Sequence, residues 1–466
     1  MEKVSPMLKS KSFGWMFLVI LFVLTQTSCK KDKNNADYPV GSNENINTWI
    51  LDSLKRYYYW NEALPSKPDL SIKPQDFFNS IRNSTDRFSY ILLPADPSTV
   101  PANNRGKYGF DYTTVSTQSP SLTFGIIKLV LNDSPASRSG LKRGDYISKI
   151  NGKQLTAANA AALQVELLSG SGVSLSLAEI EGNTLKDLRT VSLSPGFIFE
   201  QASLSRVFDT GGKKIGYLYV NDFNPGLATS VFNKFAAFKT DGITDLILDL
   251  RYNGGGQVAE AAGLCALIAG LSYDKPFITY KGNRNGGTRT ESAGITATFD
   301  GTINFNTLLQ NELGLSKVYI LGTGATASAS EVMINNLKPY LQVVLVGEKT
   351  RGKDEASFRI FDEHNPKIVE WEMHPIIYKL FNSAGNGGYS AGISPDINID
   401  ELSSLPLLPF GDLNDPLVQA AVSRITGVAR IPASGLSAKS IKIMIGNVLT
   451  DTGVQTADNS IVITHR

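Results

Sequence analysis

The chain has 466 residues, too many for one compact hydrophobic core, so two or three domains are expected. Hydrophobic residues make up 42% and charged residues 19%, a composition typical of a globular protein and not of a disordered one. The formal net charge is +2 and no basic block follows residue 35, so nucleic acid is excluded as an expected partner.

The first 29 residues have the order of a secretory signal. Three lysines precede an apolar run from Trp15 to Leu24, and small and polar residues then lead to Cys29. The run is too short for a bilayer span, which needs roughly 20 apolar residues. A cysteine at this place resembles the lipobox of bacterial lipoproteins, although Gln26 stands where that motif usually has Leu.

This resemblance implies that Cys29 becomes the first mature residue and carries a lipid that anchors the protein to a bilayer. Residues 30–44 would form a polar tether, and the protein would be an exported lipoprotein of the bacterial cell envelope, on its periplasmic face or at the cell surface. The alternative is an ordinary cleaved signal that ends near a chance cysteine. The other cysteine, Cys265, lies in an apolar stretch and is expected to be a small buried hydrophobe.

Residues 45–105 are expected to form a small helical region. Apolar side chains between Asn45 and Trp60 recur at spacings of three and four, which marks one face of a helix. A second short helix is expected from Pro74 to Arg82. One apolar face on each helix predicts that this region packs on another part of the protein.

Residues 106–194 have the pattern of a small β-rich domain. Strands are expected over Thr123–Leu131 and Tyr146–Ile150, and the second ends at Asn151-Gly152, a strong turn signal. A helix from Thr156 to Leu168 and strands near 173–180 and 188–193 follow.

The stretch NDSPASRSGLKRGDYISKINGKQL in this region resembles the PDZ domain of bacterial processing proteases. A small sheet with one flanking helix leaves a groove beside an edge strand, where an extended peptide adds as a further strand. The turn Tyr108-Gly109-Phe110 would then hold the peptide carboxylate through its amides. The alternative is a structural β-domain without a ligand.

Residues 195–410 alternate between strands and helices. The expected strands are followed by single helices, a pattern that predicts βαβ units and a largely buried sheet. The expected strands are 214–220, 245–250, 317–321 and 342–347.

Two strand-to-helix turns in this region are rich in glycine and small residues, Arg251–Gly256 and Gly322–Ser328. Each places backbone N–H groups at a helix start, where they stabilise an oxyanion or a phosphate. The glycine patterns of phosphate-binding loops are absent from both turns. None of the three histidines, His364, His374 and His465, is close to either turn in the sequence, so a serine–histidine triad and a histidine metal site are poorly supported. A lysine whose pKa is lowered by burial is the remaining candidate for a base.

Four ordered motifs resemble the C-terminal (tail-specific) processing peptidases, family S41. They are Asp249–Gly256, Thr326–Glu331, Val346–Lys353 and Gly392–Asp396. The resemblance spans about residues 45–400 and implies an α/β core like those of crotonase and ClpP, with a PDZ domain and a small helical N-terminal region. It implies neither a metal nor an organic cofactor.

By this resemblance, Ser328 is the nucleophile and Lys353, 25 residues later, is the general base. The oxyanion donors would be the amides of Ala329 and Gly255. Ser357 stands where the family often has a Gln that orients the lysine, and a hydroxyl there reaches less far. Ser330 is expected only to cap the helix or to pack. The chain also departs from the family pattern at Arg351, which replaces the common Phe, and at Gly254, which replaces Pro.

The sequence therefore predicts a serine endopeptidase that acts on polypeptides recognised by their C-terminal tails through a Ser–Lys acyl-enzyme mechanism. Two alternatives stay open: a catalytically impaired, lipid-anchored scaffold that binds peptide tails, and a binding protein for carbohydrate or small apolar ligands. The last has only the aromatic cluster Tyr57–Trp60 to support it. Residues 411–466 carry no recognised motif; a helix is expected over 412–425 and weak β patterning after it. The sequence leaves the oligomeric state open.

Overall fold

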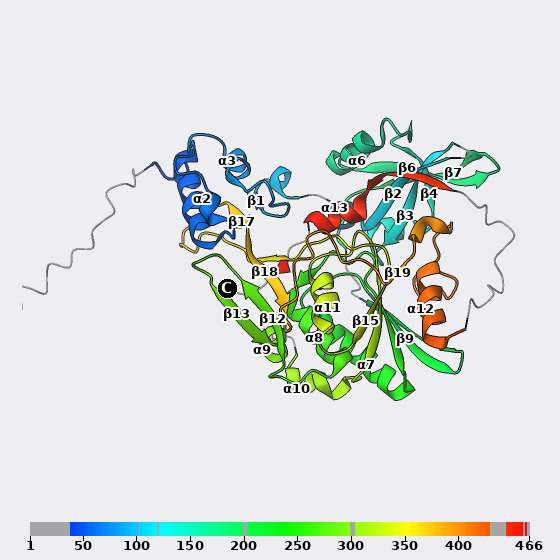
Figure 1. Ribbon diagram of the computed structural model, residues 1–466. Coiled ribbons are helices and arrows are strands. Elements are labelled where there is room, and N and C mark those ends of the chain that lie inside the picture. The colour runs from blue at the N-terminus through cyan, green and yellow to red at the C-terminus, as the bar shows by residue number, and fades with distance from the viewer. Residues whose placement is uncertain are drawn as a thin grey trace, which may run out of the picture.

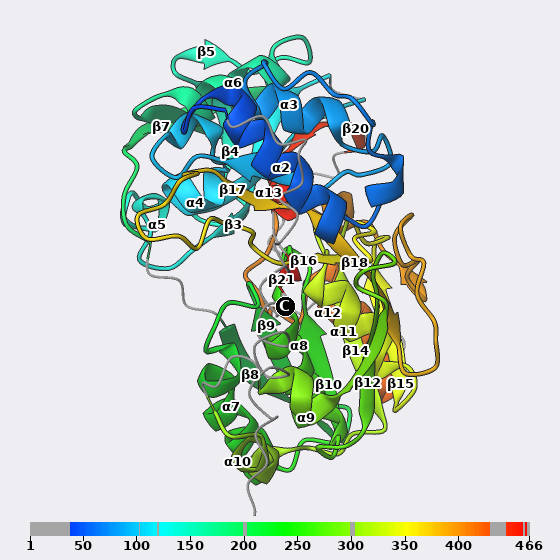
Figure 2. The same ribbon diagram turned by 90° about the vertical axis from the view of Figure 1, so that its left-hand side faces the viewer.

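The computed structural model describes residues 38–101, 103–118, 121–198, 203–298, 303–428, 444–459 and 462–463. An α/β core forms one part of the molecule, and the N-terminal helices and a β-rich unit lie together on one side of it (Figures 1 and 2). The expected signal segment, Cys29 and most of the tether lie outside the described residues. No described helix is both long enough and apolar enough to cross a bilayer.

The main sheet of the core has the strand order β19-β15-β14-β10-β9-β8 and is parallel except for the β8–β9 pair. Its strands are β8 (Ser203–Thr210), β9 (Lys213–Val220), β10 (Asp245–Asp249), β14 (Lys317–Gly322), β15 (Gln342–Gly347) and β19 (Ile397–Asn398).

Helices cover both faces of this sheet. On one face lie α7 (Leu227–Asp241), α8 (Val258–Ala269) and α11 (Ala329–Leu337), whose apolar side chains share a core with Leu218, Leu248 and Ile320. On the other face lies α12 (Pro416–Thr426), which packs on Ile215, Ile247 and Val344. Residues alternate between the two faces of a strand, so β9 and β10 supply side chains to both cores. The parallel sheet with helices on both faces confirms the expected α/β class.

A second sheet of the core has the order β11-β21-β16-β18-β12-β13. Its strands are β11 (Gly256–Gln257), β12 (Pro276–Lys281), β13 (Thr288–Ser292), β16 (Glu355–Ser357), β18 (Ile376–Asn382) and β21 (Val462–Ile463). A two-stranded pair, β1 (Tyr90–Leu92) with β17 (Glu372–His374), and two short helices, α9 (Ala293–Ala297) and α10 (Phe305–Leu308), complete this part. Strand β21, from the end of the chain, separates β11 from β16.

The N-terminal region contains the two expected helices, α2 (Asn43–Tyr57) and α3 (Pro74–Ile81). The Ser42 side chain accepts the Asn45 amide and caps α2, while Pro74 begins α3 at a position that needs no intrahelical donor. Ile50, Leu54 and Phe77 are buried in the same core as α8. The apolar faces therefore pack as the sequence predicted.

The β-rich unit has the strand order β20-β2-β3-β4-β6-β7, and β5 pairs with β4. Its strands are β2 (Phe110–Thr117), β3 (Thr123–Val130), β4 (Tyr146–Ile150), β5 (Lys153–Gln154), β6 (Val173–Glu181), β7 (Thr184–Leu193) and β20 (Ile445–Asp451). Its helices are α4 (Asn104–Tyr108), α5 (Pro135–Arg138) and α6 (Ala160–Ser169), and α13 (Thr452–Asn459) follows β20. The edge strand β20 comes from the C-terminal segment, to which the sequence assigned no role.

Candidate active site

Ser328 lies in the turn between β14 and α11, immediately before the first helical residue. Its backbone has φ 66° and ψ −120°, a conformation that L-residues rarely adopt and that is often found where a nucleophile is held on a sharp turn. The side chain is completely buried, and its Oγ has no hydrogen-bond partner among the described residues. A strained, buried serine with an unused hydroxyl is a feature that packing alone does not explain.

Glu331 joins the backbone of Ser328 to that of Lys353. Its Oε2 accepts the Ser328 amide at 2.9 Å and the Lys353 amide at 2.7 Å. Its Oε1 accepts the Gly352 amide at 2.7 Å and the Thr350 hydroxyl at 2.5 Å. One buried carboxylate thus fixes the helix start against the loop after β15, which brings the two residues together from 25 positions apart in the sequence.

Lys353 is buried, with 2% of its surface exposed. Burial lowers its pKa from 10.5 to about 8, although the carboxylates of Glu355, Asp458, Glu331 and Asp86 act in the opposite direction. Its Nζ lies 4.7 Å from the centre of the Phe88 ring. A substantial fraction of this lysine is therefore neutral near pH 8, the state that a general base requires. The structure does not show a hydrogen bond from its ammonium to Ser328 Oγ.

The glycine turn after β10 lies directly beside Ser328. A Cβ placed on Gly255 would be 2.4 Å from Ser328 Oγ and 3.1 Å from the Ala329 amide nitrogen, so only glycine fits. Gly255 also has φ +121°, which favours glycine. The two glycine-rich and small-residue turns of the sequence thus meet at one point, around the Ser328 hydroxyl.

Asn253 holds this glycine turn in place. Its side-chain oxygen accepts the Gly255 amide at 2.9 Å, so in this conformation that amide is already bonded. Its carbonyl accepts the Ala327 amide and the Ser330 hydroxyl, each at 3.0 Å. Ser330 therefore links the two turns, and use of the Gly255 amide as an oxyanion donor requires exchange of its bond to Asn253.

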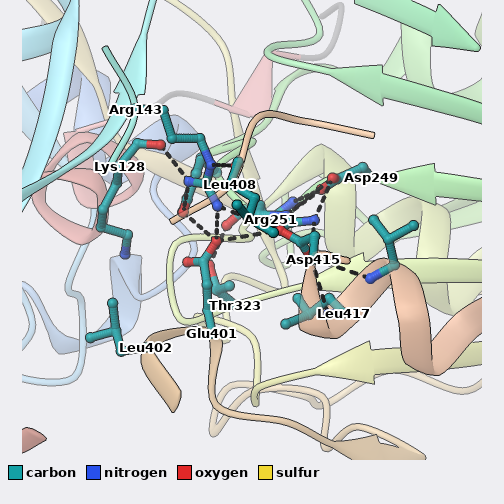
Figure 3. A network of polar contacts seen from close by, with 12 residues as sticks. Lys128, Arg143, Asp249, Arg251, Thr323, Glu401, Leu402, Leu408, Asp415 and Leu417 are labelled. Atoms are coloured by element: carbon teal, nitrogen blue, oxygen red, sulfur yellow. Dashed lines mark hydrogen bonds and ion pairs between the residues drawn. The ribbon is translucent and has the colours of Figure 1, made fainter. Parts of the chain in front are cut away.

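A buried network of ion pairs lies behind the same turn and connects the core to the β-rich unit (Figure 3). The Arg251 guanidinium contacts Asp249 at 2.8 Å, Asp415 at 2.8 Å and Glu401 at 3.0 Å. Arg143, from the β-rich unit, contacts Glu401 at 2.8 Å. Burial of this Arg251 side chain opposes its charge, but the surrounding carboxylates outweigh burial and raise its pKa. The network fixes the first residues of the turn that ends at Gly255.

The other predicted site residues lie at two places. Ser357 is buried in β16, where its Cα partners are Ile376 and Ile463. Tyr108 and Phe110 are buried, and the Gly109 amide caps α4 by bonding to the Arg105 and Asn104 carbonyls. The expected carboxylate-binding turn thus leads into β2, and the Gly109 amide is already bonded to carbonyls of α4. The role assigned to each of these residues stays a prediction.

Sequence reasoning missed the positions of Glu331 and Asn253. A signal for the first was present, because Glu three residues after a Ser at a helix start is the capping-box pattern. The bonds of Asn253 to Ala327 and Ser330 had no comparable signal, since these partners come from a turn about 75 residues further along the chain. A pocket of about 250 Å³ also borders this site, with Phe88, Gly352 and Glu355 among its lining residues.

Within the part of the chain that the structure describes, no group of three or more His, Cys, Asp or Glu side chains is placed to hold a metal ion. Cys265 is fully buried in α8, as expected, and burial raises the pKa of its thiol well above the usual value.

Three family models match separate parts of the chain. The model described as Peptidase S41 N-terminal domain matches residues 45–90, the PDZ domain matches 98–178, and Peptidase family S41 matches 214–399. These ranges contain the N-terminal helices, much of the β-rich unit and all of the residues placed around Ser328. The resemblance inferred from the motifs is confirmed.

Related proteins agree with this assignment. A carboxyl-terminal-processing protease of Picosynechococcus sp. is 29% identical over 353 residues, which cover 73% of this chain and 76% of the relative. A protein of the same name from Synechocystis sp. is 28% identical over 64% of each chain. The crystal structure of a putative S41 protease from Bacteroides fragilis superposes with a TM-score of 0.65 at 28% identity, covering 82% of this chain and 98% of that one.

Proposed function

The chain belongs to peptidase family S41, whose members are serine-type peptidases, and from this premise we propose that it cleaves polypeptides recognised by their C-terminal tails. Ser328 is the nucleophile and Lys353 the general base of this proposal. The observation that carries it is the shared Glu331 oxygen, which accepts the amides of a strained, buried serine and of a buried lysine with a pKa of about 8.

In the proposed reaction, neutral Lys353 takes the proton of the Ser328 hydroxyl as its Oγ attacks the peptide carbonyl carbon. The carbonyl oxygen becomes an oxyanion, which the amides of Ala329 and Gly255 stabilise. The lysine then gives the proton to the leaving amine, and the C–N bond breaks to leave an acyl-enzyme. Water hydrolyses the ester with the same lysine as base, which restores the serine.

The oxyanion site of this proposal is supported by the contact between Gly255 and the start of α11. A Cβ on Gly255 would lie 3.1 Å from the Ala329 amide nitrogen, so both turns face the same small volume. The N-terminus of α11 adds a favourable dipole for the negative charge. The bond from the Gly255 amide to Asn253 implies that substrate binding rearranges this turn before the reaction.

Tail recognition is assigned to the β-rich unit. Strand β2 pairs with β3 on one side and accepts an added strand on the other, which is the arrangement for binding an extended peptide. The PDZ match over residues 98–178 supports this assignment. The expected ligand is a polypeptide with a free C-terminus, held beside the edge of β2.

Membrane attachment is a separate part of the proposal. Cys29 carries a lipid, and the protein is exported and anchored to the cell envelope through this residue. Metabolic labelling of the full chain with a radioactive fatty acid tests the assignment. Incorporation that is lost in Cys29→Ala supports it, and labelling of neither protein contradicts it.

The competing function is a tail-binding scaffold without catalysis, which the occupied Gly255 amide favours. The test uses an unfolded protein with a free apolar C-terminus as substrate for the full chain and for Ser328→Ala. Cleavage by the parent alone supports the peptidase. Equal binding of the tail by both proteins with no cleavage by either, also when both chains end at residue 443, supports the scaffold. Ser230→Ala is the matched control, because it removes an exposed hydroxyl that donates to the Leu227 carbonyl within α7.

A further inference from the structure

The edge of β2, where a peptide tail would bind, is occupied by the chain's own C-terminal segment. Strand β20 pairs antiparallel with β2, from Thr117 opposite Ile445 to Thr113 opposite Asp451. The segment therefore runs toward the Tyr108-Gly109-Phe110 turn, the direction expected of a bound tail. Figure 1 shows α13, and the red strand that leads into it, beside β2.

Side chains fix this segment at the start of β2. The Tyr112 amide donates to Thr452 Oγ1 at 2.9 Å, and that hydroxyl lies 3.2 Å from Asp111 Oδ1. The Lys128 ammonium pairs with Asp451 at 2.8 Å, and both side chains are largely buried. These polar contacts give the segment one register along the strand.

Beyond β20, the segment crosses to the candidate active site. Helix α13 places Asp458 on Arg351, two residues before Lys353, with contacts of 2.5 and 2.7 Å. Strand β21 then pairs in parallel with β11, next to Gly255, and with β16 at Ser357. Residues 462–463 thus lie between β11, which follows the glycine turn, and β16, which follows the lysine.

We propose that residues 444–459 and 462–463 belong to a built-in pseudosubstrate, which occupies both the tail groove and the substrate cleft and must be displaced before another polypeptide is cleaved. This inference rests on the proposed peptidase function and adds its regulation. The described residues of this segment lie along β2, contact Arg351 in the lysine loop, and pair with both β11 and β16. A strand that merely completed the β-rich sheet would not need the second and third contacts.

Because the segment belongs to the same chain, it competes strongly with a separate peptide for the edge of β2. A segment on the same chain competes at an effective concentration set by the linker, on the order of millimolar for a short flexible one, so a separate tail must bind tightly or be abundant to replace it. The segment also adds a charge beside the base: Asp458 acts to raise the pKa of Lys353, together with Glu355, Glu331 and Asp86, against the effect of burial.

A binding experiment tests the proposal without relying on cleavage. The probe is a fluorescein-labelled peptide with the sequence of residues 444–466, and all chains carry Ser328→Ala. The full chain, a chain ending at residue 443, and the Thr452→Val and Thr450→Val variants of the full chain are compared by fluorescence anisotropy. Thr450 is the matched control, because its Oγ1 has no hydrogen-bond partner among the described residues.

We expect the shortened chain to bind the probe at least about tenfold more tightly than the full chain, because no internal segment competes. Thr452→Val leaves the Tyr112 amide without its acceptor and should tighten probe binding up to about tenfold, whereas Thr450→Val should not. Equal probe affinity of the full chain and a folded shortened chain overturns the proposal. If the shortened chain does not fold, the comparison of Thr452→Val with Thr450→Val decides, and equal probe affinities of these two variants overturn the proposal.

The same chains with Ser328 restored separate this inference from the proposed function. Tighter probe binding by the shortened chain, with no cleavage by any chain, supports the pseudosubstrate and contradicts the peptidase. Cleavage at equal rates by all chains, with unchanged probe binding, supports the peptidase and contradicts the pseudosubstrate.

Discussion

Arg251 and Lys353 are both buried cations of the same core, and their surroundings move their pKa values in opposite directions. Burial opposes the charge of both side chains. The carboxylates of Asp249, Asp415 and Glu401 contact Arg251 directly and outweigh burial. Burial prevails at Lys353, whose pKa falls to about 8. The fold therefore keeps Arg251 charged within a structural ion-pair network, whereas it makes loss of the Lys353 proton easier.

This difference is informative about where the chemistry lies. A buried, fully paired charge is typical of a structural ion pair, whereas a buried lysine with a lowered pKa next to a strained serine is typical of catalytic sites and agrees with the proposed Ser–Lys pair. Glu331 is a structural residue that lies directly beside the proposed catalytic residues. Its carboxylate accepts four hydrogen bonds, and they position the backbone of Ser328 and Lys353 without contacting the reacting atoms.

The largest expected effect is the loss of activity in Lys353→Met. Removal of the base should lower kcat/KM by about 10²–10⁴-fold, because no proton acceptor replaces it. Cleavage of an unfolded substrate measures the loss, and the exposed Lys349→Met is the matched control. Activity near the parent level in Lys353→Met would exclude this lysine as the base.

The next effect is on stability, in Arg251→Met. Three buried carboxylates would lose their shared cation, which costs about 3–5 kcal/mol in the free energy of unfolding. Urea denaturation measures the change, and Lys186→Met, at an exposed ion pair, is the control. A fall of less than about 1 kcal/mol in the free energy of unfolding, which is typical of surface ion pairs, would show that the buried network does not stabilise the fold through Arg251.

Lys353→Met should have the opposite effect on stability. Below pH 8 the parent must bury a charged ammonium, so its removal should raise the free energy of unfolding by about 3 kcal/mol. Between pH 8 and 10.5 the folded parent is neutral while the unfolded chain is still protonated, so the parent regains stability and the advantage of the variant shrinks. Urea denaturation at pH 7 and pH 10.5 measures both values. A variant that is less stable than the parent at pH 7 would show that the lysine is a paired cation like Arg251.

The smallest effect is expected for Ser357→Ala. Loss of a hydroxyl in β16 weakens hydrogen bonding by about 0.5–1.5 kcal/mol per bond, or roughly a 2–10-fold change in kcat/KM. The midpoint of the pH–rate profile should stay near that of the parent, since burial determines the pKa of the lysine. A fall of more than about 100-fold would instead give this hydroxyl the orienting role of the family's Gln.

Local patterns in the sequence predicted most of the elements. Spacings of three and four placed a helix over 45–60, where α2 spans Asn43–Tyr57, and the run Gln342–Gly347 forms β15 with the expected bounds. The two small-residue turns were found because glycine and alanine at a helix start are visible locally. Their meeting around Ser328 followed from the family resemblance and not from spacing.

Contacts between distant segments could not be predicted in this way. The partners of Arg251 include Glu401 and Asp415, about 150 residues away, and no local periodicity connects them. The sequence predicts only weak β patterning over residues 445–451, because this strand is half-exposed and carries several polar residues. Its partner strand lies far away in the sequence, in the β-rich unit. The C-terminal helix is similarly short, and its place is set by tertiary contacts such as that of Asp458 with Arg351.

The most direct test of the account is the pH dependence of Ser328 modification by a fluorophosphonate, which reacts with an activated serine and needs no tail recognition. Intact mass and peptide mapping of the full chain and of the chain ending at residue 443 would give the rate and the modified residue between pH 5.5 and 10. We predict labelling at Ser328 that rises with the loss of one proton, with a midpoint near pH 8 or below, and that is abolished in Lys353→Met. Labelling at Ser330, or a rate that Lys353→Met leaves unchanged, would contradict the Ser–Lys pair.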